Sequence, residues 1–293
     1  MISTRAAVAP WIVTLLTSVL SIPAQAQDLH VYTVVRQADS PTLRKEDSIQ
    51  GRNVTLFHAG KVYDYTYPAQ ELTVYDSVSH EFTVLNSKRR LATTISEAEI
   101  RHYLDMAEAK AEEFLGEASQ AADPTTLATA RVLEFQLHPI FRSTFVEKPA
   151  TLSMRSDIFQ YTIACMEPKA DPEAVTRYLD YADWIAQLNS VLHPQAPFPA
   201  ARLRVNEQLR TQAQLPVTVE LSVLTERAKV QLRAEHTWTW KLSTRDREMI
   251  NGWEKELKDP LLKRMAFAEF QKVTLTPLAA SRSSVTGGAM ATK

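Results

Sequence analysis

Six short runs rich in β-branched and aromatic residues follow one another in the first third of the chain, and this succession limits the possible folds more than any other feature. The runs span residues 31–35, 54–58, 61–67, 71–75, 81–85 and 90–94. Turn-forming pairs such as Ala59-Gly60 and Asp76-Ser77 separate several of them. Short strands joined by tight turns leave no room for crossover helices, so the pattern predicts an antiparallel meander rather than βαβ units.

Helical and strand patterns alternate over the rest of the chain. We expect helices from Ser96 to about residue 123, over 172–192, near 200–212 and from Ser243 to about 272, the last broken at 259–260. Glu99 and Asp246 stand three residues after Ser96 and Ser243, where each can complete a capping box. We expect strands over 131–145, 151–165, 217–223 and 230–242. The last of these is much longer than a usual strand, which favours a strongly curved sheet. The fold class predicted is therefore α+β, a curved, half-barrel-like antiparallel sheet covered by several helices, in one domain over residues 27–275.

The N-terminus has the features of a signal peptide. Arg5 is followed by a mostly apolar stretch without a charge over residues 6–22, and then by Pro23-Ala24-Gln25-Ala26, which has small residues in the A-x-A arrangement that signal peptidase recognises. We expect residues 1–26 to be removed after Ala26, and an uncleaved membrane anchor is the alternative. Cleavage predicts an exported protein of the periplasm or cell envelope, without a membrane span in the mature chain. Residues 276–293 are small and polar, and we expect them to be disordered.

Charge and glycine content exclude several classes of function. The chain has 33 basic and 34 acidic side chains, so no basic excess indicates a nucleic-acid partner. It has only six glycines, and two of these, Gly287 and Gly288, lie in the polar tail. Loops that wrap phosphates need glycine for close backbone approach, which argues against P-loop and dinucleotide-binding folds.

No local motif indicates catalysis, a metal or a cofactor. The seven histidines show no zinc-binding spacing, although a discontinuous site, for example from His58 and His236, is conceivable. Cys165 lacks a nearby histidine or aspartate pattern, so we expect a small apolar residue on a strand rather than a nucleophile. We expect a protein that is not an enzyme and has no cofactor, while a site assembled only in three dimensions stays open.

Aromatic residues on the predicted strands are the best candidates for a binding site. Tyr63, Tyr65 and Tyr67 share one strand face, and Trp238 and Trp240 share another. One interpretation is that these residues form the core beneath the helices. The other is that one concave face is incompletely covered and takes an apolar ligand. The candidate ligand-binding residues are Phe57, Tyr63, Tyr65, Val74, Val84, Trp238 and Trp240.

Residues 54–91, VTLFHAGKVYDYTYPAQELTVYDSVSHEFTVLNSKRRL, have the rhythm of repeated hairpins. This segment resembles the hairpins of the periplasmic lipoprotein-carrier fold, a half-barrel closed by helices. It is also similar to uncharacterised exported proteins that are abundant in planctomycete-type bacteria. The resemblance implies a curved sheet that holds a lipid or a lipoprotein acyl chain between sheet and helices. The additional helical stretch near 172–212 departs from that pattern.

Two hypotheses of function follow. The first is an exported, non-catalytic binding protein for an apolar or lipidated ligand held between sheet and helices. The alternative is a structural or protein-interaction protein of the cell envelope that binds no small ligand and docks an envelope protein.

Overall fold

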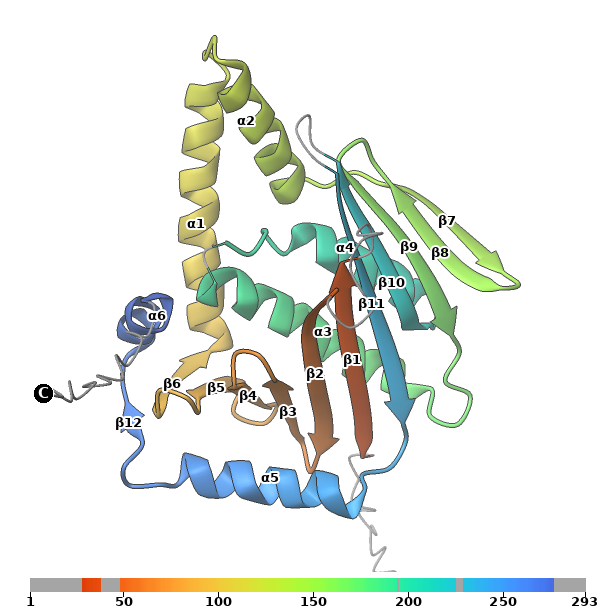
Figure 1. The fold of residues 1–293 in the computed structure, drawn as a ribbon. Helices are drawn as coiled ribbons and strands as arrows, with labels where there is room; N and C mark the ends of the chain where they lie inside the picture. The colour runs from red at the N-terminus through yellow and green to blue at the C-terminus, as the bar shows by residue number, and fades with distance from the viewer. Residues whose placement is uncertain (1–27, 38–47, 194, 225–228, 277–293) are drawn as a thin grey trace, which may run out of the picture.

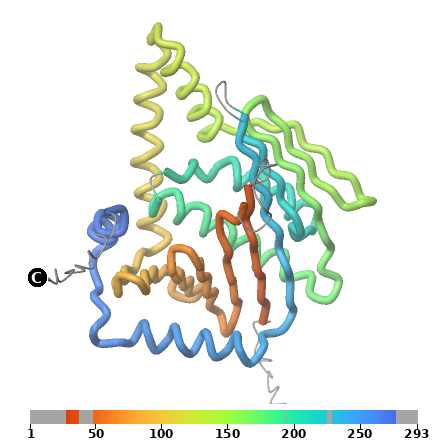
Figure 2. Tube along the Cα trace, viewed as in Figure 1, coloured from red at the N-terminus to blue at the C-terminus, as the bar shows by residue number. Residues whose placement is uncertain are grey.

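A computed structural model describes residues 28–37, 48–193, 195–224 and 229–276 (Figures 1 and 2). The predicted signal peptide, residues 1–26, lies outside this part of the chain, as does the predicted disordered tail apart from Thr276. Within the described residues, no helix combines the length and the hydropathy that crossing a membrane requires.

A single open sheet of twelve strands forms the centre of the molecule. The strands are β1 (Leu29–Gln37), β2 (Ile49–His58), β3 (Lys61–Thr66), β4 (Glu71–Asp76), β5 (Glu81–Asn86), β6 (Leu91–Ser96), β7 (Arg142–Glu147), β8 (Ala150–Arg155), β9 (Phe159–Met166), β10 (Leu215–Leu224), β11 (Lys229–Thr239) and β12 (Lys263–Arg264). Their order is β12-β6-β5-β4-β3-β2-β1-β11-β10-β9-β8-β7. All neighbours pair antiparallel except β12 and β6, and the two ends of the sheet stay apart in Figure 1. The predicted α+β fold with an antiparallel sheet is confirmed.

The meander β3–β6 has a regular ten-residue period. The strands begin at Lys61, Glu71, Glu81 and Leu91 and contain six residues each. Gln70, His80 and Arg90 precede the last three with φ values of 51°, 56° and 53°. A residue in the left-handed region reverses the chain so that the next strand pairs with the previous one. The first hairpin instead turns on Ala59 and Gly60, both with positive φ, as a two-residue loop requires.

Six helices cover the sheet within the described residues. They are α1 (Glu97–Ala118), α2 (Pro124–Leu137), α3 (Glu173–Leu192), α4 (Ala200–Thr211), α5 (Thr244–Leu257) and α6 (Phe267–Leu275). The capping boxes predicted from Ser96 and Ser243 are present, at the beginnings of α1 and α5. The helix predicted from Ser243 breaks before Pro260, and the chain then forms β12 before α6 begins.

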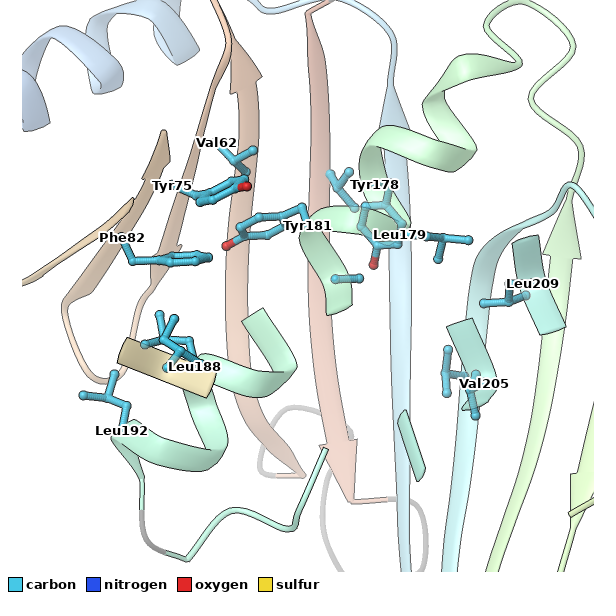
Figure 3. Packing of buried hydrophobic residues seen from close by; sticks show 14 of the residues in the cluster. Val62, Tyr75, Phe82, Tyr178, Leu179, Tyr181, Leu188, Leu192, Val205 and Leu209 are labelled. Carbon is cyan, nitrogen blue, oxygen red and sulfur yellow. The ribbon is translucent and has the colours of Figure 1, made fainter. Parts of the chain in front are cut away.

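The helices divide between the two faces of the sheet. On one face, residues of α1, α3, α4 and α6 join the inward side chains of the strands in a large apolar core; we call this the α3 face. Figure 3 shows Tyr75 and Phe82 of the meander beside Tyr181 and Leu188 of α3. On the other face, Ile250 of α5 belongs to a smaller core with strand residues such as Leu56 and Leu72; we call this the α5 face. The sheet therefore has an apolar core on each side.

The structure corrects two predicted strands. Residues 151–165 do not form one strand, because the chain turns at residues 156–158 and pairs β8 with β9 in antiparallel register. Residues 131–145 do not form a strand, because α2 continues to Leu137 and β7 covers only Arg142–Glu147. The Asp123 carboxylate accepts a hydrogen bond of 2.9 Å from the backbone N–H of Thr126, and Pro124 occupies the first helical turn. Both features begin a helix where the sequence pattern indicated only the end of the previous one.

Candidate functional site

The seven residues predicted to bind a ligand lie on opposite faces of the sheet. Phe57 and Val84 belong to the core of the α3 face, and Trp238 and Trp240 pack against that core. Tyr63 and Val74 belong to the core of the α5 face, with Tyr65 packed against it. Because the sheet separates these groups, a single ligand between sheet and helices could contact only one of them.

On the α5 face, the two tyrosines hold helix α5 on the sheet. The ring centroid of Trp253 lies 6.4 Å from that of Tyr63 and 5.5 Å from that of Tyr65, with interplanar angles of 18° and 24°. The Tyr63 hydroxyl donates a hydrogen bond of 2.8 Å to Glu254. These aromatic residues are therefore engaged in helix packing.

On the α3 face, the predicted residues also contact protein groups. Phe57 meets the ring of Tyr181 edge-on at 5.8 Å. Trp238 packs edge-on against Tyr178 at 4.8 Å, and its indole N–H donates to the carbonyl of Pro216 at 2.9 Å. Val84 is fully buried. None of the predicted residues lines the cavity that lies beneath helix α3 on this face.

That cavity has a volume of about 320 Å³ and lies between strands β1–β3 and helix α3. Most of the side chains that line it are polar, and we call it the Asp64 cavity. The residues that line it are Thr33, Val35, Gly51, Arg52, Asn53, Thr55, Asp64, Thr66, Tyr178, Tyr181, Ala182, Ile185 and Asn189. A cavity of this size can hold a small organic molecule.

Asp64 is a carboxylate buried in the wall of this cavity, with 7% of its surface exposed. The Tyr181 hydroxyl donates to Asp64 Oδ2 at 2.7 Å. The Asn53 amide donates to Asp64 Oδ1, and the Thr55 hydroxyl is a third hydrogen-bond partner. All three donors are neutral, so the carboxylate is held by hydrogen bonds rather than by an ion pair.

This environment changes the acidity of both members of the Asp64–Tyr181 pair. Burial raises the pKa of Asp64 to about 6, although the hydrogen bonds from Tyr181, Thr55 and Asn53 act to lower it. Burial and the neighbouring Asp64 raise the pKa of Tyr181 well above its ordinary value. Asp64 therefore changes its charge near pH 6 while Tyr181 remains a donor. A strongly perturbed acid in a cavity is a candidate for a functional group.

Strand register extends the polar wall across the sheet. Thr55 lies directly opposite Asp64, and Thr33 lies directly opposite both Asn53 and His236. Thr33 Oγ1 and His236 Nδ1 are 2.9 Å apart and share a hydrogen bond. Burial, followed by the charge of Arg202, lowers the pKa of His236 to about 4, so this imidazole is neutral at pH 7.

The residues that the sequence offered as metal ligands or as a nucleophile lie apart from one another in the structure. Among the described residues, no group of three or more histidine, cysteine or acidic side chains could hold a metal ion. His58 and His236, considered together from the sequence, face opposite sides of the sheet, since His58 shares its side with Leu56 and His236 shares its side with Trp238. Cys165 lies on β9, where burial raises the pKa of its thiol to about 11, so the thiol is protonated at pH 7.

Sequence reasoning missed Asp64 although the strand pattern contains it. Asn53 and Thr55 alternate with the same period as Phe57, and Asp64 alternates with the same period as Val62. Polar residues in register with buried apolar ones indicate a polar group beneath the helices, because successive side chains point to opposite faces. Tyr63 and Tyr65, on the other face of the same strand, were interpreted as ligand-binding residues instead.

Comparison with known proteins adds little to this site. No family model matches the chain, and no curated protein matches it. Among solved structures, an uncharacterized conserved protein from Thermus thermophilus is similar over 82% of this chain and 91% of its own, with 9% sequence identity and a TM-score of 0.29. A similarity at that TM-score transfers neither a fold nor a function to this chain.

Proposed function

We propose that this protein is an exported, non-catalytic binding protein that holds a small organic cation in the Asp64 cavity. One observation carries the proposal: a buried carboxylate lines a cavity and makes no ion pair within the described residues. Burial of an unpaired carboxylate is unfavourable, and an ammonium or amidinium group in the cavity would supply the missing charge. Arg52 also lines the cavity, but its own side chain is exposed and forms no ion pair with Asp64 in the structure.

The other walls of the cavity suit the same ligand class. Tyr178 and Tyr181 contribute aromatic rings, whose faces attract cations. Thr33, Thr66 and Asn189 contribute further polar side chains that can accept hydrogen bonds from an amine. The proposal therefore replaces the acyl chain expected from the sequence with a polar ligand, because the predicted apolar residues pack against each other and against helices. Export to the periplasm or cell envelope rests on the N-terminal sequence.

The test uses benzylamine as a probe and benzyl alcohol as its neutral isostere. Isothermal titration calorimetry at pH 7.5, where Asp64 is ionised, should show benzylamine binding at least tenfold tighter than benzyl alcohol. Asp64→Asn should abolish this preference, while Asp105→Asn, at an exposed position on α1, should preserve it. At pH 5, protonation of Asp64 should weaken benzylamine binding by about tenfold. Equal binding of both probes, or an unchanged preference in Asp64→Asn, would refute the proposal.

A protein-interaction function remains the second candidate, and the edge of the sheet favours it. Strand β7 pairs only with β8 and leaves its other side unpaired among the strands that the structure describes. Its Val146 is 49% exposed. Exposed edge strands can pair with a segment of another protein. If an envelope protein docks here, Val146→Lys should lose a partner that wild type retains in affinity purification from envelope extracts, whereas Asp64→Asn should retain it.

A further inference from the structure

A second cavity, of about 610 Å³, lies between the C-terminal end of α2 and the turn between β8 and β9. In Figure 1, the segment that follows α2 runs directly to these outer strands. The residues that line the cavity are Arg131, Glu134, Phe135, His138, Ile140, Arg142, Arg155, Ser156, Asp157, Ile158 and Gln160. It shares no lining residue with the Asp64 cavity. We call it the arginine cavity.

Two of its arginines are direct neighbours across the β7–β8 ladder. Arg142 lies opposite Arg155 in the strand register. Neither guanidinium has an ion-pair or hydrogen-bond partner among the residues that the structure describes. Like charges directly opposite each other in an antiparallel pair destabilise a sheet. Both side chains are exposed, so solvent screens much of this repulsion, but the two unpaired guanidiniums concentrate positive charge at the wall of the cavity.

The other charged residues that line the cavity neutralise little of the positive charge of Arg142 and Arg155. Arg131 lies 3.6 Å from Asp157, whose side chain is 91% exposed. Glu134, on α2, is the other carboxylate of the cavity. His138, also in the wall, is engaged with Glu112 of α1 at 2.7 Å. With Asp157 beside Arg131, only Glu134 remains to offset the two opposed arginines.

The cavity also has an apolar side. The ring centroid of Phe135 lies 5.3 Å from those of Phe141 and Phe159, so its position is fixed by packing. Ile140 is 82% exposed, although it is a large apolar residue. The walls thus combine cationic groups with apolar surface, which suits an anion that carries an apolar group.

We propose that the arginine cavity binds a phosphate monoester with an apolar substituent. Guanidinium groups bind phosphate oxygens through paired, charge-assisted hydrogen bonds, and two adjacent guanidiniums match a doubly charged phosphate. Phe135 and Ile140 contact the apolar substituent. This site is separate from the Asp64 cavity, so its existence does not depend on the function proposed above.

Calorimetric titration of the full-length protein with phenyl phosphate at low salt tests the proposal. Wild type should bind, and Arg142→Gln and Arg155→Gln should each weaken binding at least tenfold. Arg204→Gln is the matched control, because Arg204 is an exposed arginine of α4 that pairs with Glu207 at 2.9 Å. Asp64→Asn should bind phenyl phosphate as wild type does. Absence of binding in wild type, or an equal loss in Arg204→Gln, would overturn the proposal.

Two further measurements complete the test. The first distinguishes a lipid headgroup from a soluble phosphate ester, and the second tests whether Arg155 only supports the fold. Cosedimentation with phosphatidic acid vesicles that depends on Arg155 would assign a lipid headgroup, and binding of phenyl phosphate alone would assign a soluble ester. Without ligand, Arg155→Gln should unfold at the same or a slightly higher temperature, because the like-charge contact is relieved. A clear decrease in that temperature would show that Arg155 supports the fold, which contradicts the proposal.

Discussion

The two faces of the sheet use the same strands for different purposes. On the α5 face, Tyr63 and Tyr65 pack on Trp253, and the core beside them contains apolar residues. On the α3 face, the neighbouring positions of the same strand place Asp64 beneath Tyr181 at the wall of a cavity. The difference teaches that aromatic residues on one face of a strand need not form a binding site, because they can instead attach a helix to the sheet. The polar residues that alternate with these aromatic residues point to the opposite face of the sheet, where the Asp64 cavity lies.

The largest expected effect on stability comes from truncating a buried side chain on each face of the sheet, which tests whether both faces are packed cores. Phe82→Ala, on the α3 face, should lower the free energy of unfolding by about 3–5 kcal/mol, because Phe82 is fully buried. Leu72→Ala, equally buried on the α5 face, should lower it by about 2–5 kcal/mol. Urea unfolding of both variants checks these values. A loss below about 1 kcal/mol for Leu72→Ala would show that α5 is only loosely attached.

The next prediction concerns the pH dependence of stability, which the buried carboxyl group of Asp64 introduces on the α3 face. Asp64 has a pKa near 4 when unfolded and about 6 when folded, so the folded state holds its proton more tightly. The contribution of Asp64 to the free energy of unfolding is fully present below pH 4 and is lost as the pH rises through 6. The total loss is on the order of 3 kcal/mol. We expect the difference in unfolding free energy between wild type and Asp64→Asn to follow this curve.

The difference curve is needed because His236 acts in the opposite direction. Its pKa is lowered to about 4 in the folded state, so its contribution is present above the unfolded value near 6.5 and is lost as the pH falls through 4. Asp64→Asn removes the contribution of Asp64 and leaves that of His236, so the difference between wild type and the variant reports on Asp64. A difference curve without slope between pH 4 and 6 would contradict the buried, ionisable Asp64.

Trp253→Ala tests the structural role of the aromatic residues on the α5 face. The variant should lose about 2 kcal/mol of stability, less than a fully buried tryptophan would, because Trp253 is only partly buried. Benzylamine affinity should stay within twofold of wild type. Loss of affinity without loss of stability would return the ligand site to the residues predicted from the sequence.

The smallest expected effect belongs to one member of a matched pair of hydroxyl deletions. Tyr181→Phe removes a hydrogen bond to the buried Asp64, which we expect to cost about 1.5–3 kcal/mol at pH 7.5 and to raise the pKa of Asp64 further. Tyr63→Phe removes a hydrogen bond to the partly exposed Glu254, which we expect to cost about 1 kcal/mol or less. Unfolding at pH 7.5 measures both. Equal losses would remove the distinction between the two faces.

Much of the fold followed from local patterns. Alternation and turn residues predicted the strands that became β1–β6, and the caps at Ser96 and Ser243 predicted where α1 and α5 begin. The ten-residue period was not predicted, because Gln70, His80 and Arg90 occupy equivalent loop positions with different side chains. Helix α2 was missed because alternation over residues 131–137 is compatible with either a strand or a helix.

The site could not be predicted to the same extent because it depends on which element covers which face. Sequence parity places Tyr63 and Asp64 on opposite sides of β3 but does not say which side α3 covers. Tyr181 reaches Asp64 across 117 positions of sequence. A contact of that kind follows from the packing of α3 on the sheet, which no local pattern contains.

Carbon-13 NMR titration of the Asp64 carboxyl group, with Asp64→Asn for assignment, tests the central claim most directly. The free protein should show a pKa near 6 for this carboxyl. Saturation with benzylamine should lower that pKa, because a bound cation stabilises the carboxylate. A pKa near 4 in the free protein, or one near 6 that benzylamine leaves unchanged, would contradict the assignment of the ligand site to the Asp64 cavity.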